Sequence, residues 1–304
     1  MEWERAKNYI LVAFIILNLG LAGLLFVENR RYTLTDDRVR DINTVLSANN
    51  INLYAAPMRR FAPMRRFAPM RHLNISGFYY DVQWLLSIFF ENPENVLQEE
   101  TEDERQYIFR EGNRRLVISN GFITFDNYYG LSENDMWLHF SEDEETERVS
   151  REDALAKTDE FIDEFFPDFR RDIVFDQFGG GGVHVMYLQE YRGRVIHSNF
   201  IEFLVTKDGI AWIEMQFGQV LGYSRDSRMI FAPDEILLTF LQRMQHEAMA
   251  NPIFISSIDM VYLQEYASDQ PGSTYPAVPF YRIFVRDRDF PFLINAYTNI
   301  PYNF

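Results

Sequence analysis

The stretch VHVMYLQEYRGRVIHSNFIEFLVTKDGIAWIEMQF, residues 183–217, carries a clear strand pattern. Apolar residues recur with the two-residue period of β-strands in three runs, at 183–191, 195–205 and 210–217. Arg192-Gly193 and Lys207-Asp208-Gly209 separate these runs and are typical of tight turns. The pattern predicts an antiparallel meander.

Residues typical of helix starts precede this meander and two other groups of predicted strands. Thr35, Ser150 and Pro233 each precede apolar residues at helical spacing, as caps or first-turn residues do. The acidic run SEDEETE at 141–147 separates the two halves of the chain. We therefore predict an α+β fold with two lobes of antiparallel sheet covered by helices, at 28–149 and 150–304.

The run YILVAFIILNLGLAGLLFV at 9–27 carries no charge. As a helix it is roughly 28 Å long, close to the hydrocarbon thickness of a bilayer. It predicts a single transmembrane helix, an uncleaved signal anchor, with residues 1–8 forming a cytoplasmic N-terminus and the remaining chain extracytoplasmic. The expected location is the cell membrane, and the lipid bilayer is an expected partner of residues 9–27.

Small and polar residues in this run are candidate contacts to partner helices, because they allow close backbone approach or hydrogen bonding in lipid. On a helical wheel they form two faces, and the alternative is an inert anchor. The candidate contact residues are Ala13, Asn18, Gly20, Ala22 and Gly23.

A tandem repeat at 56–72 reads APMRRF, APMRRF, APMRH. Its regularly spaced prolines exclude a helix or a central strand, so we predict an extended loop. The arginines are a candidate contact loop for an acidic surface, and a tolerated duplication is the competing interpretation. They are Arg59, Arg60, Arg65, Arg66 and Arg71.

Composition excludes several function classes. The chain has 45 acidic and 29 basic residues, a net charge of −16, which argues against nucleic-acid binding. It has no cysteine, and His184 and His197 alone do not define a zinc site. No catalytic set of residues emerges, so we expect no enzyme, no cofactor and no metal.

The opening MEWERAKNYILVAFIILNLGLAGLLF resembles the amino terminus of the YycI (WalI) family. The segments LSANNI, ISNGFITFDN, AVPFYRIFVRD and FLINAYTN follow in the family's order. The resemblance covers nearly the whole chain, whereas the APMRRF repeat departs from the family pattern.

The resemblance implies a membrane-anchored accessory regulator of the Wal (YycFG) two-component system. Such a protein associates with a sensor histidine kinase and a YycH-like partner and modulates signalling in cell-wall homeostasis. Two alternatives remain open. One is a stand-alone envelope binding module for a peptide or cell-wall ligand, which needs an open edge strand and a groove. The other is an anchored hydrolase, which needs a convergent set of titratable groups.

Overall fold

The structure is a computed structural model of the 304-residue chain. It describes residues 2–53, 67–77, 81–99, 101, 106–119, 121–127, 149–176, 182–264, 273–288 and 290–302.

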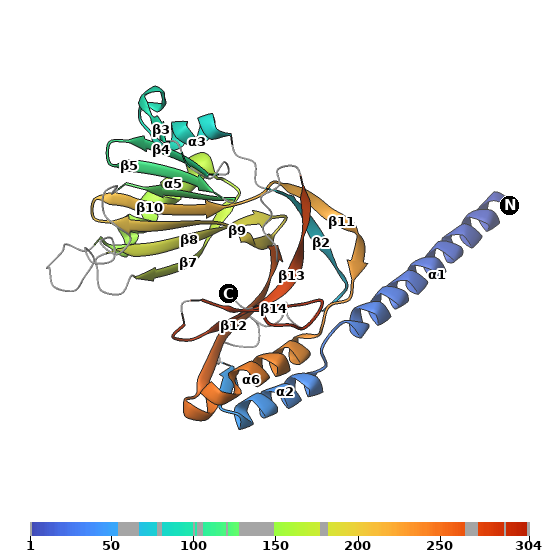
Figure 1. Ribbon diagram of the computed structural model, residues 1–304. Helices are drawn as coiled ribbons and strands as arrows, with labels where there is room; N and C mark the ends of the chain where they lie inside the picture. The colour runs from blue at the N-terminus through green and yellow to red at the C-terminus, as the bar shows by residue number, and fades with distance from the viewer. Residues whose placement is uncertain are drawn as a thin grey trace. The chain divides into compact units, whose positions relative to one another are not determined.

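Helices precede groups of strands along the described chain (Figure 1). The helices are α1 (Glu2–Arg31), α2 (Asp36–Ala48), α3 (Val82–Phe89), the 3-10 turn η2 (Pro93–Asn95), α5 (Arg151–Phe165) and α6 (Pro233–Ala250). The strands are β1 (Ile51–Leu53), β2 (Met70–Ser76), β3 (Leu97–Glu99), β4 (Gln106–Glu111), β5 (Arg114–Ser119), β6 (Phe122–Asp126), β7 (Phe169–Asp176), β8 (Val183–Tyr191), β9 (Arg194–Thr206), β10 (Gly209–Gln216), β11 (Val220–Arg228), β12 (Ile253–Gln264), β13 (Thr274–Val285) and β14 (Phe292–Asn295).

Two compact units divide the chain, and each unit draws on separate stretches of sequence. Unit 1 holds Met1–Met70, Arg228–Asp259 and Tyr281–Phe304, and unit 2 holds Arg71–Ser227 and Met260–Phe280. The long strands β12 and β13 each have one part in unit 1 and one part in unit 2.

The predicted meander is confirmed in unit 2. β7, β8, β9, β10, β6, β5, β4 and β3 lie in that order, each antiparallel to the next. The β8–β9 turn places both Arg192 (φ 52°) and Gly193 (φ 74°) in the left-handed region. This geometry matches the right-handed twist of paired strands, which is why the two-residue turn is favoured here.

The core of unit 2 lies on one face of this sheet. One buried residue from each of six neighbouring strands lies in a single row across the sheet. These residues are Val185, Phe203, Ile213, Phe125, Leu116 and Phe109. Helix α5 packs on the sheet through β8, β9 and β10, with Ala154 and Ile162 buried (Figure 1). Burial of a large apolar side chain contributes about 1.5–3 kcal/mol, so this row is a main source of stability.

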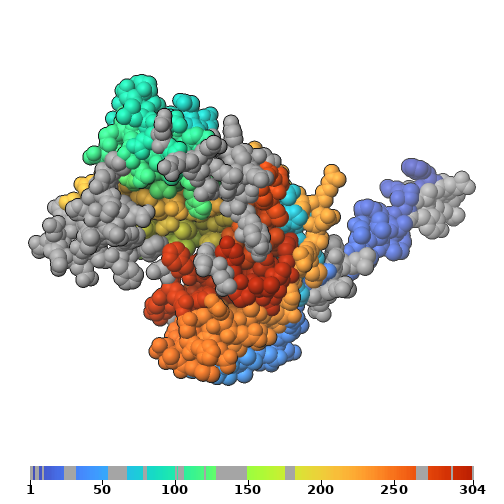
Figure 2. All heavy atoms as spheres, viewed as in Figure 1, coloured from blue at the N-terminus to red at the C-terminus, as the bar shows by residue number. Residues whose placement is uncertain are grey.

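Unit 1 is built around the helix pair α2 and α6, which lie side by side (Figures 1 and 2). Ile42 and Leu46 are the buried residues of α2, and those of α6 include Phe240 and Met244. Strand β1 follows α2 directly and pairs in parallel with β12, Ile51 opposite Ile253. The strand that follows α2 therefore lies beside β12, the strand that follows α6.

The predicted fold class is wrong in two respects. The strands form mixed rather than purely antiparallel sheet, because β1 and β9 both pair in parallel with β12. Alternation along a strand shows which side chains share a face but carries no information on strand direction. The second correction concerns the transmembrane part of the prediction: within the described residues, the structure contains no helix with both the length and the apolar character needed to cross a membrane.

Candidate functional site

Helix α1 presents an exposed surface that is apolar apart from Asn18. From Ile10 to Gly23 every residue of the helix is exposed. The large apolar side chains on it are Ile10, Leu11, Val12, Phe14, Ile15, Ile16, Leu17, Leu19 and Leu21, with exposed fractions from 48% to 68%. Contiguous exposed apolar surface of this kind marks an interaction site, since water contact with it is unfavourable.

The predicted helix-contact residues all lie on this surface. Ala13, Gly20, Ala22 and Gly23 are exposed, and a Cβ added at either glycine meets no atom within 4 Å. The amide nitrogen of Asn18 donates a hydrogen bond to the Phe14 carbonyl at 2.8 Å, one turn back in the same helix. The amide of Asn18 is thus partly satisfied within α1, and the two glycines leave room for close approach.

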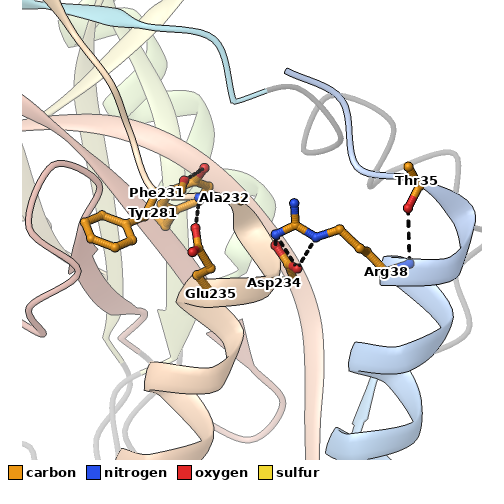
Figure 3. Close-up of polar contacts among 7 residues, drawn as sticks. All are labelled: Thr35, Arg38, Phe231, Ala232, Asp234, Glu235 and Tyr281. Carbon is orange, nitrogen blue, oxygen red and sulfur yellow. Dashed lines mark hydrogen bonds and ion pairs between the residues drawn. The ribbon is translucent and has the colours of Figure 1, made fainter. Parts of the chain in front are cut away.

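A short connection joins α1 to α2. The Phe67 amide donates to the Tyr32 carbonyl at 3.0 Å, and the two rings meet edge to face at 6.3 Å. Thr35 then caps α2, as predicted, with its hydroxyl accepting from the Arg38 amide at 3.4 Å (Figure 3). The cap satisfies an amide that the first turn of a helix leaves without a partner.

Arg38 and Asp234 link α2 to α6 (Figure 3). The guanidinium donates through Nε to Oδ2 and through Nη2 to Oδ1, both at 2.8 Å. The Arg38 side chain is 44% exposed and that of Asp234 only 15%. Asp234 also lies in the first turn of α6, where the helix dipole favours a carboxylate. The ion pair therefore fixes α2 against the start of α6.

Two further hydrogen bonds order the start of α6, and the second of them joins it to β13 (Figure 3). The Ala232 amide donates to Glu235 Oε2 at 2.8 Å, and the Tyr281 hydroxyl donates to the Phe231 carbonyl at 2.8 Å. Burial, followed by the charges of Asp234 and Glu235, raises the pKa of Tyr281. The phenol thus stays protonated and remains a donor.

The predicted basic contact loop falls only in part on described residues. Arg71 is exposed at the start of β2, and its carbonyl accepts a hydrogen bond from the Tyr262 hydroxyl at 2.9 Å. The end of the repeat is therefore strand rather than the predicted extended loop. The other four arginines, Arg59, Arg60, Arg65 and Arg66, lie outside the described residues.

Sequence reasoning missed an open cavity in unit 2. It has a volume of about 500 Å³ and lies beside α3, α5 and β10. Aromatic rings of the core border it, with Phe89 stacked on Phe125 at 4.7 Å and Phe161 near Phe165 at 5.1 Å. Charged groups also line it, namely Glu91, Arg114, Lys157, Glu160 and Glu164. No sequence motif pointed to it, because the lining comes from segments far apart in the chain.

The face of the unit 2 sheet opposite the core carries neighbouring ionisable side chains. Glu202 and Glu214 are direct cross-strand neighbours, and His184 Nδ1 lies 3.0 Å from Glu202 Oε1. Burial, followed by the charge of Glu202, raises the pKa of Glu214. The described residues contain no cluster of three or more His, Asp or Glu side chains suited to a metal ion.

No family model matches the chain, and no curated protein does. Among solved structures, an uncharacterized protein from Eubacterium rectale aligns with a TM-score of 0.49 at 11% identity, covering 79% of this chain and 87% of that chain. YycH from Bacillus subtilis aligns with a TM-score of 0.43 at 11% identity, covering 73% of this chain and 52% of its own. The chain thus spans about half the length of that YycH.

Proposed function

We propose that this chain is a non-catalytic accessory regulator, held at the cell membrane, that modulates a sensor histidine kinase together with a YycH-like partner. The observation that carries the proposal is the exposed apolar surface of α1. The sequence resemblance to the YycI family supports the choice of partners. Lipid and the apolar helices of partners are the surroundings that lower the free energy of such a surface.

The attachment of α1 to unit 1 supports a regulatory role. Tyr32, directly after α1, contacts Phe67, Thr35 caps α2, and the Arg38–Asp234 ion pair joins α2 to α6. A change in unit 1 that moves α2 against α6 is thereby coupled to the helix that meets the partner. Regulation requires that α1 bind one arrangement of the kinase more tightly than the other.

The test is recovery of partners from native membranes with the full-length chain. The variant carries Gly20→Leu and Gly23→Leu, at two positions of α1 where an added Cβ meets no atom within 4 Å. Ile15→Leu, a swap of equal volume at an exposed position, is the matched control. We expect the native chain and the control to recover a histidine kinase and a YycH-like protein, and the glycine variant to recover several-fold less. Equal recovery by all three chains contradicts a contact through α1.

Membrane attachment is tested separately by fractionation of the full-length chain carrying Ile15→Glu and Leu19→Glu. Two carboxylates on the apolar surface raise the cost of lipid contact by several kcal/mol. We expect the variant to leave the membrane fraction. Retention at the native level contradicts attachment through α1.

The alternative of a binding module draws support from unit 2. Its cavity of about 500 Å³ combines an aromatic floor with charged residues, as ligand sites do. Within the described residues β7 pairs only with β8, so it offers a sheet edge. Two results together support this second function. Neither regulatory partner is recovered, and the NMR signals of Lys157 or Arg114 shift when peptide or wall fragments are added.

A further inference from the structure

A second cavity lies in unit 1, between α6 and the segment that includes β14. Its volume is about 360 Å³, within the range of small-molecule sites. The residues of α6 that line it are Phe240 and Arg243, and the facing residues are Arg288, 290–294, Pro301 and Tyr302. The proposed function does not use this cavity.

Two guanidinium groups line this cavity in a strongly acidic chain. Arg288 forms an ion pair with Glu247 and lies 4.9 Å from the centre of the Phe292 ring. Arg243 is exposed on α6, and among the described residues it has no ion-pair partner. The described residues that line the cavity include these two arginines and no carboxylate, so the lining carries a net positive charge although the chain as a whole carries −16.

The remaining wall is apolar and ordered by ring packing. Phe240 meets Phe292 edge to face at 5.3 Å, and Leu293 and Ile294 are buried beside them. The cation over the Phe292 ring is held by charge–quadrupole attraction, which orients the Arg288 guanidinium at the cavity wall. Apolar and cationic groups thus converge on one small volume.

We propose that this cavity binds a small anion with an apolar body, such as a carboxylate or phosphate monoester that carries an aromatic or short aliphatic group. The guanidinium of Arg243 pairs with the anion, because its planar donors match two oxygens of a carboxylate or phosphate. The rings of Phe240 and Phe292 contact the apolar body. The positive charge of the lining arginines excludes a cation of the same shape from the cavity.

The experiment measures binding by calorimetry to the full-length protein in a nonionic detergent. The probes are 4-phenylbutyrate, phenyl phosphate and, as a cation of similar shape, 4-phenylbutylamine. We expect an anion to bind and the amine not to bind. Binding of the carboxylate alone, or of the phosphate alone, identifies the source of the anion and supports the proposal. Equal binding of the amine, or no binding of either anion, overturns it.

Variants locate the site. Arg243→Gln is expected to weaken binding of the preferred anion roughly tenfold, the usual effect of losing one charge-assisted contact. Arg243→Lys is expected to restore part of that loss. Arg40→Gln removes the same charge from an exposed position on α2, where Arg40 pairs with Asp37, and is expected to change binding less than twofold. Equal weakening by Arg40→Gln and Arg243→Gln shows a general charge effect and overturns the assignment.

Discussion

Arg38 on α2 and Asp234 in the first turn of α6 are 196 residues apart in sequence and share two hydrogen bonds of 2.8 Å. Both partners are planar, so the pair fixes orientation as well as distance. The residues belong to α2 and α6, the two helices around which unit 1 is built. The connection that follows α1 leads directly into α2.

The Arg38–Asp234 pair is expected to contribute about 0.5–1 kcal/mol, at the upper end for an exposed pair, because Asp234 is mostly covered. A double-mutant cycle of Arg38→Gln and Asp234→Asn in urea unfolding measures this coupling, which high salt should reduce. The more exposed Arg40–Asp37 pair is the control and should show a smaller coupling. A coupling near zero contradicts the role of the pair as a link between α2 and α6.

Tyr281→Phe is expected to destabilise the protein by about 1 kcal/mol at neutral pH, because the Phe231 carbonyl loses its hydroxyl donor. The raised pKa of Tyr281 also sets a pH dependence. The unfolded phenol ionises near its ordinary pKa of about 10 while the folded one does not, so stability falls as the pH rises above that value. Thermal unfolding at pH 7–11 should show a shallower alkaline loss in the variant than in Tyr107→Phe, a change at an exposed position.

Glu214→Gln is expected to stabilise the protein at neutral pH. The pKa of Glu214 is raised in the folded state by burial and by Glu202, so its charged form opposes folding. As the pH falls through the folded pKa, the carboxyl is protonated and the difference between the two chains should disappear. Urea unfolding between pH 4 and 8 measures this. A difference that persists at low pH, or one equal to that of the exposed Glu190→Gln, refutes the electrostatic explanation.

Gly218→Ala is expected to cost about 1–3 kcal/mol, the usual range for overpacking. An added Cβ would collide with the Ser76 carbonyl oxygen and lie 2.6 Å from Ile75 Cγ2, and a backbone oxygen cannot rotate away. Asn199 holds the same glycine through hydrogen bonds to its carbonyl and its amide. Gly23→Ala, where the Cβ meets nothing within 4 Å, is the control in the same unfolding measurement. Equal stability of the two variants contradicts the close packing of Gly218, in the connection from β10 to β11, against the end of β2.

Local structure was readable from local sequence. The turn at Arg192-Gly193, the Thr35 and Ser150 caps and the start of α6 at Pro233 follow from short-range sterics and hydrogen bonding. These interactions involve residues a few positions apart. The sequence therefore predicted them without knowledge of the rest of the chain.

The candidate site was only half predictable. The apolar run that forms α1 is evident in the sequence, and the candidate contact residues lie exposed on this helix. The attachment of that helix through Arg38 and Asp234 was not predictable. In the sequence alone, each residue is an ordinary charged residue in the first turn of its helix.

Helices and strands are specified locally: the period of apolar residues distinguishes strand from helix, and caps and turns show where each begins and ends. The folded chain was needed to show which strands pair and in which direction, how three stretches of chain assemble unit 1, and which charged residues meet across helices. This difference arises because period and capping act within a few residues. Pairing and packing depend on surfaces far apart in the chain, and these surfaces meet only when the whole core is buried.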